Sequence, residues 1–488
     1  MKLDALIRSI ETVAVGGPAS REIVGVVCDS RQVRPGALFV AVHGASRDGA
    51  AYIEDALQRG AAAVVSEHPL PARKEACHIQ VRDARAALAS LACEFHNHPA
   101  DSLQMVGITG TNGKTTTAYM TRDILRAAGR NPGLLTTVEY EIGTRAIPAG
   151  RTTPDAPTLQ AMLAQMVSKG CLSAVMEVSS HALDQRRAAG IDFDVAVFTN
   201  LGRDHLDYHH TREEYFAAKR LLFARLGEGR KHAAALINAD DPWGQRLLAM
   251  VNPKARTLTF GHQAAADVRA EDIRLQPDQT LFRARTPWGT IDVGTQFLGR
   301  YNVSNALAAI GAAGALGVPV ERMAPALRGM LPVPGRLQEF RAPQGFQVFV
   351  DYAHTDDALA NVLGTLRDLT RGRLIAVFGC GGNRDVTKRD PMGAVAAKLA
   401  DYSILTSDNP RREDPASIIA QIRAGFGSSS RFEIVEDRAE AIHRAVRMAQ
   451  AGDVVLVAGK GHETFQEFAT TTVPFDDRAV VEKEIASL

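Results

Sequence analysis

The sequence predicts an α/β protein of three domains, and three observations support this fold class. The 488 residues suggest about three domains of roughly 150 residues each. Short apolar runs alternate with helix-compatible segments, which is typical of parallel sheets with crossover helices. The stretch MVGITGTNGKTTTAYM, at 105–120, reads as strand, glycine-rich turn and helix. We expect a small N-terminal α/β domain at 1–98, a central P-loop ATPase-type domain with a mostly parallel sheet at 99–332, and a C-terminal Rossmann-like α/β domain at 333–488.

The composition excludes several classes of protein. A net charge of +1 argues against bulk electrostatic binding to nucleic acid or to an anionic membrane. Five scattered cysteines without a C-x-x-C pair fit a reducing compartment and argue against a zinc site or a disulfide framework. The start MKLDALIRSI lacks a signal-peptide core, and no apolar run approaches ~18 residues. We therefore expect a cytoplasmic protein without a membrane span.

The first domain is predicted to contain strands at 23–31, 36–42 and 62–67, with helices at 53–61 and 84–99. Two polar stretches, 29–31 and 43–45, follow the first two strands. Strand ends hold ligands in sheets of this class. From the pattern alone, however, ordinary turn chemistry is the preferred interpretation of both stretches.

The turn at 110–116 has the composition of a phosphate-binding loop. Backbone N–H groups and a helix N-terminus favour an anion there, Lys114 can reach a terminal phosphate, and Thr115 supplies a hydroxyl for magnesium. The residue five positions before Gly113 is Ile108, so the motif is a shortened G-x-x-G-K-T. A glycine-rich turn before an ordinary helix is the alternative, but the order of strand, glycines, Lys and Thr favours phosphate binding.

Two further features of the central domain could bind a metal. We predict strands at 106–109, 174–177 and 195–199, and Glu177 closes the second of them, where a carboxylate can hold magnesium directly or through water. A solvated strand end explains Glu177 equally well. The loop after the third strand, TNLGRDHLDYHH, holds two aspartates and three histidines, including His205. It is either a metal and phosphate site or a polar loop, and histidine is a second-rank ligand for magnesium.

Lys219 lies on a predicted helix at 213–226. Most lysines on such helices are solvated. In buried or cationic surroundings the pKa of a lysine falls, and the neutral amine can capture carbon dioxide as a carbamate. The spacing does not decide between these two states. An Ala-rich helix at 302–316 and a Pro-rich linker at 331–335 follow.

The third domain is predicted to contain strands at 346–353, 373–379, 402–408 and 453–459, each ending in polar residues or glycine. GCGGNR is not a dinucleotide fingerprint, because Arg384 stands where a third glycine is required. Arg384 and Arg411 follow strand ends and could bind carboxylates, and with Asp408 and Glu463 they could recognise a ligand that carries both ammonium and carboxylate groups. Surface ion pairing is the alternative.

Motifs along the whole chain resemble those of the Mur ligase family, the ATP-dependent amino-acid-adding enzymes of peptidoglycan synthesis. In chain order they are TGTNGKTT, EVSSHAL, TNLGRDHLDYH, AAKRLLF, YNVSNALAA, PGRLQ, DYAHTDDAL and GKGHE. The stretch SDNPRREDP resembles the signature of members that add meso-diaminopimelate, and the lysine-adding relatives lack its first arginine.

The resemblance implies an ATP-dependent amide ligase of cytoplasmic peptidoglycan precursor synthesis. Such an enzyme adds meso-2,6-diaminopimelate to UDP-N-acetylmuramoyl-L-alanyl-D-glutamate through an acyl phosphate, and it releases ADP and phosphate. Magnesium would be the metal, the first domain would bind the UDP-sugar, and we expect a monomer. A related ligase such as a folate polyglutamate synthase, or a nucleotide-dependent switch without ligase activity, remains an alternative.

The resemblance also implies residue roles. Lys114, Glu177, His205 and Lys219 would be catalytic, with Lys219 carbamylated, and Thr115, Glu177 and His205 would hold magnesium. The ATP site would comprise Thr109, Gly110, Thr111, Asn112, Gly113, Lys114, Thr115, Asn302, Arg336 and Asp351. The UDP-sugar and its peptide would be bound by Cys28, Ser30, His43, Gly44, Ala45, Thr152, Thr153, Ser179, Gln185 and Arg187. Diaminopimelate would be bound by Arg384, Asp408, Asn409, Pro410, Arg411, Gly459 and Glu463.

Two positions depart from the family pattern. Arg151 stands before the two threonines where a small amide is expected, and Cys28 occupies a position that often holds leucine. These departures leave open which contacts Arg151 and Cys28 make with the sugar-peptide.

Overall fold

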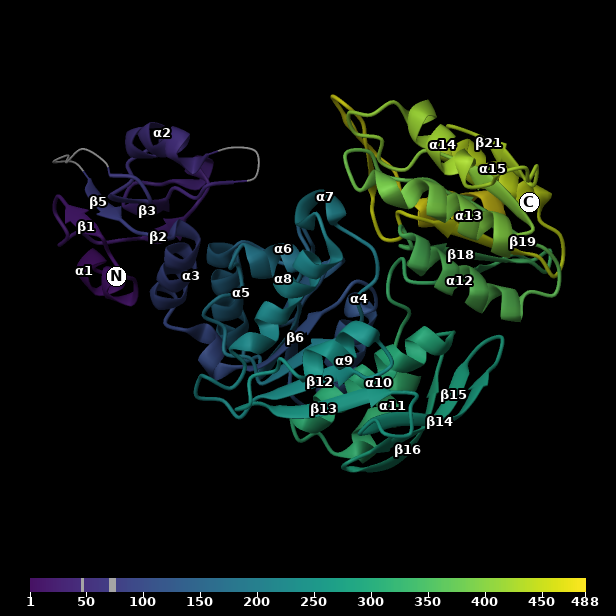
Figure 1. The fold of residues 1–488 in the computed structure, drawn as a ribbon, viewed down its shortest axis with the longest axis horizontal. Helices are drawn as coiled ribbons and strands as arrows, with labels where there is room; N and C mark the ends of the chain where they lie inside the picture. The colour runs from purple at the N-terminus through teal and green to yellow at the C-terminus, as the bar shows by residue number, and fades with distance from the viewer. Residues whose placement is uncertain (45–47, 70–75) are drawn as a thin grey trace.

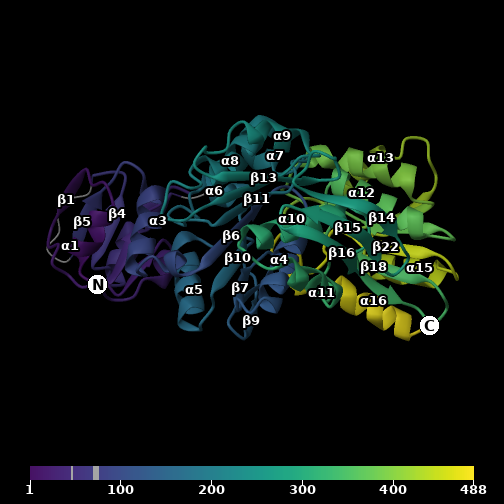
Figure 2. The ribbon, with the colours of Figure 1, turned by 90° about the horizontal axis from the view of Figure 1, so that it is seen from below.

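The computed structural model describes residues 1–44, 48–69 and 76–488. Three sheets follow one another along the chain, and each is accompanied by its own helices (Figure 1). The first and third sheets lie at opposite ends of the molecule, with the second sheet between them, as Figure 2 shows from a second direction. The predicted three-domain α/β fold is confirmed, while the domain boundaries at 98 and 332 stay predictions.

The first sheet has the strand order β1-β5-β4-β3-β2 and is parallel except for β1. Its central strands are buried along their whole length, as expected when both faces of a parallel sheet are covered. The strands are β1 Ala14–Gly16, β2 Gly25–Val27, β3 Ala37–Val40, β4 Ala63–Ser66 and β5 Cys77–Gln80, and the helices are α1 Leu3–Leu6, α2 Ile53–Gln58 and α3 Ala84–Phe95.

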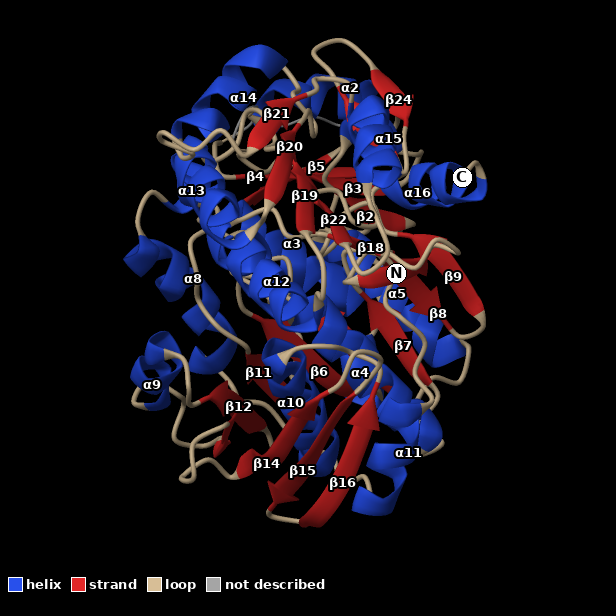
Figure 3. Cartoon of the chain, turned by 90° about the vertical axis from the view of Figure 1, so that its right-hand side faces the viewer, coloured by secondary structure: helices blue, strands red, loops and turns tan. Residues whose placement is uncertain are grey.

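The second sheet has eleven strands in the order β16-β15-β14-β13-β12-β11-β6-β10-β7-β8-β9. The strands from β14 to β7 in that order pair in parallel, and antiparallel strands extend the sheet at both edges, β15 and β16 at one and β8 and β9 at the other (Figure 3). The strands are β6 Gln104–Thr109, β7 Pro132–Leu135, β8 Glu139–Ile142, β9 Arg145–Pro148, β10 Ser173–Glu177, β11 Val195–Phe198, β12 Ala234–Asn238, β13 Arg256–Gly261, β14 Val268–Leu275, β15 Thr280–Thr286 and β16 Gly289–Thr295.

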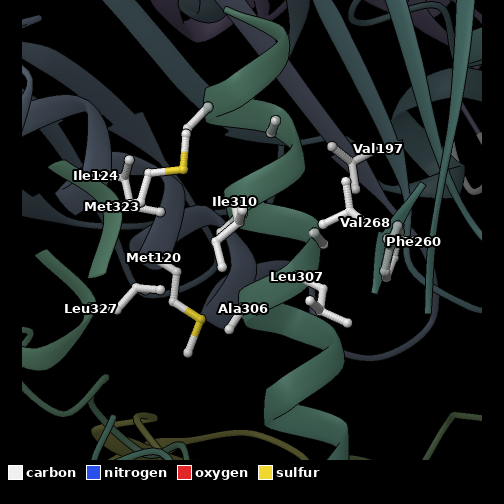
Figure 4. Packing of buried hydrophobic residues seen from close by; sticks show 14 of the residues in the cluster. Met120, Ile124, Val197, Phe260, Val268, Ala306, Leu307, Ile310, Met323 and Leu327 are labelled. Carbon is white, nitrogen blue, oxygen red and sulfur yellow. The ribbon is translucent and has the colours of Figure 1, made fainter. Parts of the chain in front are cut away.

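The helices around the second sheet are α4 Lys114–Ala127, α5 Ala156–Ser168, α6 Ser180–Asp184, α7 Leu206–His209, α8 Arg212–Ala224, α9 Pro242–Leu248, α10 Arg300–Ala315 and α11 Met323–Arg328. Helix α10 is apolar nearly all round, which is typical of a buried helix. In Figure 4, its Leu307 and Ile310 lie between Met120 of α4 and Phe260 of the sheet. This packing brings the first turn of α10 to the phosphate loop.

The third sheet has the order β17-β18-β22-β19-β20-β21 and is parallel except for β17. Its strands are β17 Gln338–Arg341, β18 Gln347–Asp351, β19 Leu374–Phe378, β20 Tyr402–Leu405, β21 Phe432–Ile434 and β22 Val454–Ala458, followed by the hairpin β23 Phe465–Glu467 and β24 Thr472–Pro474. Its helices are α12 Asp356–Leu369, α13 Arg389–Leu399, α14 Pro415–Ala424, α15 Arg438–Met448 and α16 Asp477–Ala486.

The sequence predicts the buried parallel strands better than the other elements. Helix α4 begins at Lys114, inside the predicted turn at 110–116, because the loop leads directly into its first turn. The strand predicted at 23–31 is wrong beyond residue 27, where β2 ends. A 3₁₀ turn follows, because the Asp29 carboxylate accepts a hydrogen bond from the Arg31 amide and caps that turn. In the described part of the chain, no helix is long and apolar enough to cross a membrane.

We predict that Asp477→Ala destabilises the C-terminal domain by about 3–5 kcal/mol, because it leaves the buried Arg438 guanidinium without its partner. The two side chains are fully buried, with Arg438 Nε 2.7 Å from Asp477 Oδ1. Glu440→Ala removes an exposed pair with Arg444 on the same helix and should cost less than about 1 kcal/mol. Denaturant unfolding of both variants measures the difference, and equal losses would contradict the prediction.

Candidate active site

The loop after β6 is held in place by the end of β11. Thr199 Oγ1 donates to the Asn112 carbonyl at 2.7 Å, and the Asn112 amide donates to Asn200 Oδ1 at 2.9 Å. The Thr111 amide donates to the Asn200 carbonyl at 2.9 Å. Both sides of the loop are therefore fixed by residues that directly follow a neighbouring strand, as the order of parallel strands requires.

Two glycines of the loop leave no room for a side chain. A Cβ on Gly110 would lie 1.8 Å from Thr199 Oγ1, and one on Gly113 would lie 2.3 Å from Asn305 Oδ1. Gly113 also has φ +85°, in the left-handed region that favours glycine, and it caps α4. The backbone thus approaches its neighbours closely at the point where a phosphate would meet the helix N-terminus.

Two lysine amines meet at one backbone carbonyl. Lys114 Nζ donates to the Gly110 carbonyl at 2.9 Å, and Lys219 Nζ donates to the same oxygen at 2.8 Å. Lys219 comes from α8, a predicted helix that the structure confirms, and its amine lies 4.3 Å from the ring centroid of Tyr215. The side chain of Lys219 is buried, so the solvated alternative is excluded.

Both amines have lowered pKa values. Burial lowers the pKa of Lys219 well below its usual value of 10.5, and the neighbouring Lys114 charge lowers it further. Burial also lowers the pKa of Lys114, although Glu177 and Asp204 act in the opposite direction. The neutral amine that carbamate formation requires is therefore favoured at Lys219 by its surroundings.

Glu177 ends β10 with a fully buried side chain. Its carboxylate accepts from the Thr137 amide at 2.9 Å, and Thr137 Oγ1 lies 3.2 Å from its other oxygen. Thr137 Oγ1 also lies 3.0 Å from Thr152 Oγ1. Glu177 is therefore a buried, oriented carboxylate and not a solvated strand end.

The polar loop after β11 faces the C-terminal domain. His205 Nε2 lies 3.4 Å and His354 Nε2 lies 3.6 Å from Asp204 Oδ2. Burial acts to raise the pKa of Asp204, but neighbouring groups that include His354 and Lys388 hold it well below its usual range. Burial lowers the pKa of His205 to about 3, so its ring is neutral and a nitrogen is free to coordinate a metal.

A cavity of about 570 Å³ lies between the central and C-terminal domains. Its lining includes most residues of the expected nucleotide site: Thr111, Asn112, Gly113, Lys114, Thr115, Asn302, Arg336 and Asp351. Arg336 crosses from the C-terminal domain and donates from Nη2 to Thr115 Oγ1 at 3.0 Å. Glu177 and His205 also line the cavity, whereas Thr109, Gly110 and Lys219 lie behind its wall.

The donor set fits magnesium bound together with phosphates. Within residues 1–44, 48–69 and 76–488, no three His, Cys, Asp or Glu side chains cluster closely enough to hold a metal by themselves. The cavity nevertheless presents a hydroxyl (Thr115), a carboxylate (Glu177) and a neutral imidazole (His205). Magnesium usually keeps several waters and takes only one or two protein carboxylates alongside substrate phosphates.

The residues expected to bind the sugar-peptide form two groups. Thr153, Gln185 and Arg187 are interconnected: Arg187 Nη1 donates to the Thr153 carbonyl at 3.0 Å and its Nη2 donates to Gln185 Oε1 at 2.6 Å. Thr153 Oγ1 also donates to the Glu177 carbonyl at 2.9 Å, which joins this group to the cavity, and Thr152 and Ser179 line the cavity itself.

The second group lies on the N-terminal domain and does not line the cavity. It comprises Cys28, Ser30, His43 and Gly44, while Ala45 lies outside the described residues. Burial raises the pKa of the Cys28 thiol to about 12, so this departure from the family pattern adds no charge. Arg151 and Arg187 both act on Cys28 electrostatically, which places these two arginines near the junction of the two domains.

The residues expected to bind diaminopimelate are brought together at the strand ends of the third sheet. A Cβ on Gly381 would lie 3.0 Å from Arg411 Nη1 and 3.8 Å from Arg384 Cγ, so both arginines flank this glycine. Arg411 Nε donates to Glu467 at 2.8 Å and its Nη1 donates to the Gly382 carbonyl at 2.8 Å. Among the described residues, no partner bonds its Nη2.

Glu463, another member of this group, is bonded by two neighbouring side chains. Asn409 Nδ2 donates to Glu463 Oε2 at 2.8 Å, and Lys460 Nζ donates to the same oxygen at 3.0 Å. Asp408 lies against Gly459, where an added Cβ would be 2.5 Å from Asp408 Oδ2. Pro410 lies against Gly382, where an added Cβ would be 2.0 Å from the Pro410 carbonyl oxygen. None of these residues lines the cavity, but Tyr352 does, and its hydroxyl lies 3.5 Å from Glu463 Oε1.

Three stretches of the chain match models of the Mur ligases. Residues 22–96 match the Mur ligase family catalytic domain, 108–313 the Mur ligase middle domain, and 335–461 the Mur ligase glutamate ligase domain. The chain belongs to the Mur ligase family. It is accordingly an ATP-dependent ligase of peptidoglycan precursor synthesis.

Relatives that match over nearly the full length of this chain support its membership of the Mur ligase family. A UDP-N-acetylmuramoyl-L-alanyl-D-glutamate–2,6-diaminopimelate ligase of Geobacter metallireducens is 44% identical, over 99% of this chain and 98% of that protein. A UDP-N-acetylmuramyl-tripeptide synthetase of Roseiflexus sp. is also 44% identical, over 100% and 99%. A solved structure of a UDP-N-acetylmuramoyl-L-alanyl-D-glutamate–2,6-diaminopimelate ligase is 34% identical, with a TM-score of 0.69 over 99% of each chain.

Several residues of this Mur ligase site lie outside every predicted set. Thr137 orients Glu177, Asn305 packs on Gly113, and Tyr352, His354 and Lys460 connect the C-terminal domain to the cavity or to Glu463. Tyr352 and His354 belong to the motif DYAHTDDAL and Lys460 to GKGHE, so the motifs contained the signal. Thr137 lies in no such motif, and only the fold reveals its contact.

We predict that Gly110→Ala abolishes nucleotide binding by this Mur ligase, because the new methyl group would collide with Thr199 Oγ1 and displace the loop. Titration with a fluorescent ATP analogue measures the loss. Gly364→Ala, in α12 with no atom within 4 Å of the added Cβ, is the matched control and should bind normally. Normal affinity of the Gly110→Ala variant for the ATP analogue would contradict the close contact between the loop and Thr199 at the end of β11.

A second prediction concerns Lys219 and pH. Its folded-state pKa lies well below the 10.5 of the unfolded chain, so the unfolded state binds more protons between these two values and stability rises with pH there. Lys219→Met should remove this part of the slope, whereas Lys169→Met, at an exposed lysine, should leave it unchanged. Urea unfolding between about pH 7 and pH 10 gives the slopes. An unaltered slope in Lys219→Met would show that the amine is not held neutral.

Proposed function

We propose that this Mur ligase joins meso-2,6-diaminopimelate to UDP-N-acetylmuramoyl-L-alanyl-D-glutamate, with ATP converted to ADP and phosphate. The observation that carries the proposal is the position of the cavity. A lysine-bearing phosphate loop and the buried Glu177 form one of its walls, and residues of the C-terminal domain that include Arg336 and Tyr352 form the other. The paired arginines belong to this same C-terminal domain and lie outside the lining of the cavity. The relatives named for this reaction, at 44% identity over nearly the whole chain, support the same assignment.

The first chemical step is transfer of the γ-phosphoryl group of ATP to a free carboxylate of the D-glutamyl residue. The carboxylate oxygen forms the new P–O bond as the bond to the ADP oxygen breaks, which gives an acyl phosphate. Lys114 and Arg336 lie where negative charge spreads over the transferring group, and such fixed charges are a large source of catalysis in phosphoryl transfer. No protein nucleophile takes part.

Thr115, Glu177 and His205 would hold magnesium, which supplies charge neutralisation for the phosphates when it is bound. Lys219 would carry a carbamate. Its neutral amine attacks the carbon of carbon dioxide and releases a proton, which converts a buried cation into an anion beside the metal site. Thr137 keeps the Glu177 carboxylate oriented throughout.

The second step is attack of the diaminopimelate amine on the acyl phosphate carbon, with phosphate as the leaving group. The acyl phosphate reacts readily with water, so closure of the C-terminal domain over the central domain would protect it. His354 and Arg336 extend across this boundary to Asp204 and Thr115. The two substrates therefore react in a site that both domains enclose.

Selection of diaminopimelate over lysine would depend on Arg411 and Arg384. Arg411 is held at Nε and Nη1 by protein oxygens, and no partner among the described residues bonds its Nη2, which would donate to the ligand's carboxylate. Asp408 and Glu463 supply negative charge for an ammonium group. Lysine lacks the second carboxylate and would leave the arginines without a partner, a type of mismatch that can cost on the order of 10⁴ in kcat/KM.

The N-terminal domain, 1–98, would bind the UDP-sugar through Cys28, Ser30, His43, Gly44 and Ala45. Thr152, Thr153, Ser179, Gln185 and Arg187 would place its peptide portion in front of Glu177. The bond between Thr153 Oγ1 and the Glu177 carbonyl supports this assignment, because it joins one of these residues to the strand end that carries Glu177.

Phosphate release with the UDP-dipeptide and ATP tests the proposal, with meso-diaminopimelate, L-lysine or no acceptor present. We expect release to depend on meso-diaminopimelate. Lys114→Ala should abolish it, and Arg411→Ala should raise the KM for diaminopimelate by about 100-fold or more while the KM for ATP stays within about twofold.

Arg412→Ala is the matched control for Arg411, since it removes a neighbouring guanidinium for which no side-chain bond is found among the described residues. Equal use of lysine and diaminopimelate by the wild type would refute the assigned acceptor. Near-normal turnover of Arg411→Ala at low diaminopimelate would refute the role of that arginine.

A further inference from the structure

The loop 459–463, which follows β22, is packed tightly against the linker before β17. A Cβ on Gly335 would lie 2.1 Å from the His462 amide nitrogen, and one on Gly461 would lie 2.8 Å from Tyr352 Cβ. Both glycines have positive φ, +64° and +53°. The backbone of the loop at 461–462 therefore lies close against the linker and Tyr352, and the imidazole of His462 contacts the central domain.

The imidazole of His462 bonds to the residue that orients Glu177. Its Nε2 lies 3.1 Å from the Thr137 carbonyl, so this nitrogen carries the proton and donates. Burial, and then the nearby Arg336 charge, lower the pKa of His462 to about 3, so the ring is neutral in this contact. The amide and the hydroxyl of the same Thr137 are 2.9 Å and 3.2 Å from the two oxygens of Glu177.

The other side of His462 faces the amino-acid site. The next residue is Glu463, which is bonded to Asn409 and Lys460, and its second oxygen lies 3.5 Å from the Tyr352 hydroxyl. The ring of Tyr352 lies 5.0 Å from the ring of His462. Glu463, which is expected to bind the acceptor, is therefore connected through the adjacent His462 and then Thr137 to Glu177, the carboxylate expected to hold magnesium.

A second bridge between the same domains serves the nucleotide side. Arg336 stacks at 4.5 Å on the ring of Tyr352 and donates to Thr115 Oγ1 at 3.0 Å. The hydrogen bond of His462 uses none of the atoms of this bridge. The two bridges are therefore separable: one contacts the phosphate loop, and the other contacts the turn that positions Glu177.

We propose that His462 is a positioning residue that couples the acceptor site to the phosphoryl-transfer site, by fixing Thr137, and through it Glu177, when the loop with Glu463 is engaged. The inference rests on the proposed function, because it assigns the two sites their substrates. His462 touches no reacting atom. Its role is to hold Glu177 so that the acyl phosphate forms within reach of the incoming diaminopimelate amine.

The test compares His462→Ala with His462→Gln, whose Nε2 can replace the donor. For each enzyme we would measure kcat, the KM for ATP and for diaminopimelate, and the amide formed per ADP released. His462→Ala should lower kcat for amide formation by up to about 100-fold, as a misplacement of about 1 Å can. It should also release ADP without amide, with the KM for ATP within about twofold, and Gln should restore most of both losses.

His443→Ala is the matched control. His443 bonds to Glu484 between α15 and α16, away from the cavity, and its removal should change neither kcat nor the ratio of amide to ADP. A wild-type ratio and kcat in His462→Ala would overturn the inference, as would equal losses in Ala and Gln accompanied by a lowered Tm. If the wild type itself forms no amide, the proposed function fails instead.

Discussion

The convergence of two lysine amines on the Gly110 carbonyl is the constraint on which the rest of the site depends. Lys114 and Lys219 donate to the same oxygen at 2.9 and 2.8 Å, in a place where burial disfavours two positive charges. Such a site is relieved by an anion, by loss of a proton, or by conversion of one amine into an anion. A phosphate at Lys114 and a carbamate at Lys219 would satisfy all of these conditions together.

The architecture explains how this constraint is maintained. The buried helix α10 packs on α4, which places Asn305 against Gly113, and the end of β11 holds the opposite side of the loop. The C-terminal domain contacts the central domain through residues that include Arg336, His354 and His462, and Asp357 adds a contact to Arg203. A cavity between two such domains suits a reaction in which substrates enter and water is then excluded.

The sequence predicts the parts of this arrangement that are local. Gly113, Lys114 and Thr115 are contiguous, and their strand–turn–helix context is visible as a pattern. Parallel strands such as β11 and β22 are buried on both faces and are apolar throughout, and the sequence predicts them. Strand β14, which pairs antiparallel with β15, mixes buried with exposed residues and is not among the predicted strands. Thr137 could not be predicted either, because its bond to Glu177 joins segments 40 residues apart.

The central claim is that the loop delivers a phosphoryl group to a carboxylate and not to water. It is tested most directly with a UDP-dipeptide whose D-glutamyl carboxylates carry ¹⁸O, by mass spectrometry of the phosphate released during amide formation. The account predicts one ¹⁸O atom in each released phosphate, because the amine attacks the acyl carbon, the C–O bond breaks, and the bridging ¹⁸O leaves with the phosphate. Phosphate without ¹⁸O, together with normal amide formation, would contradict it.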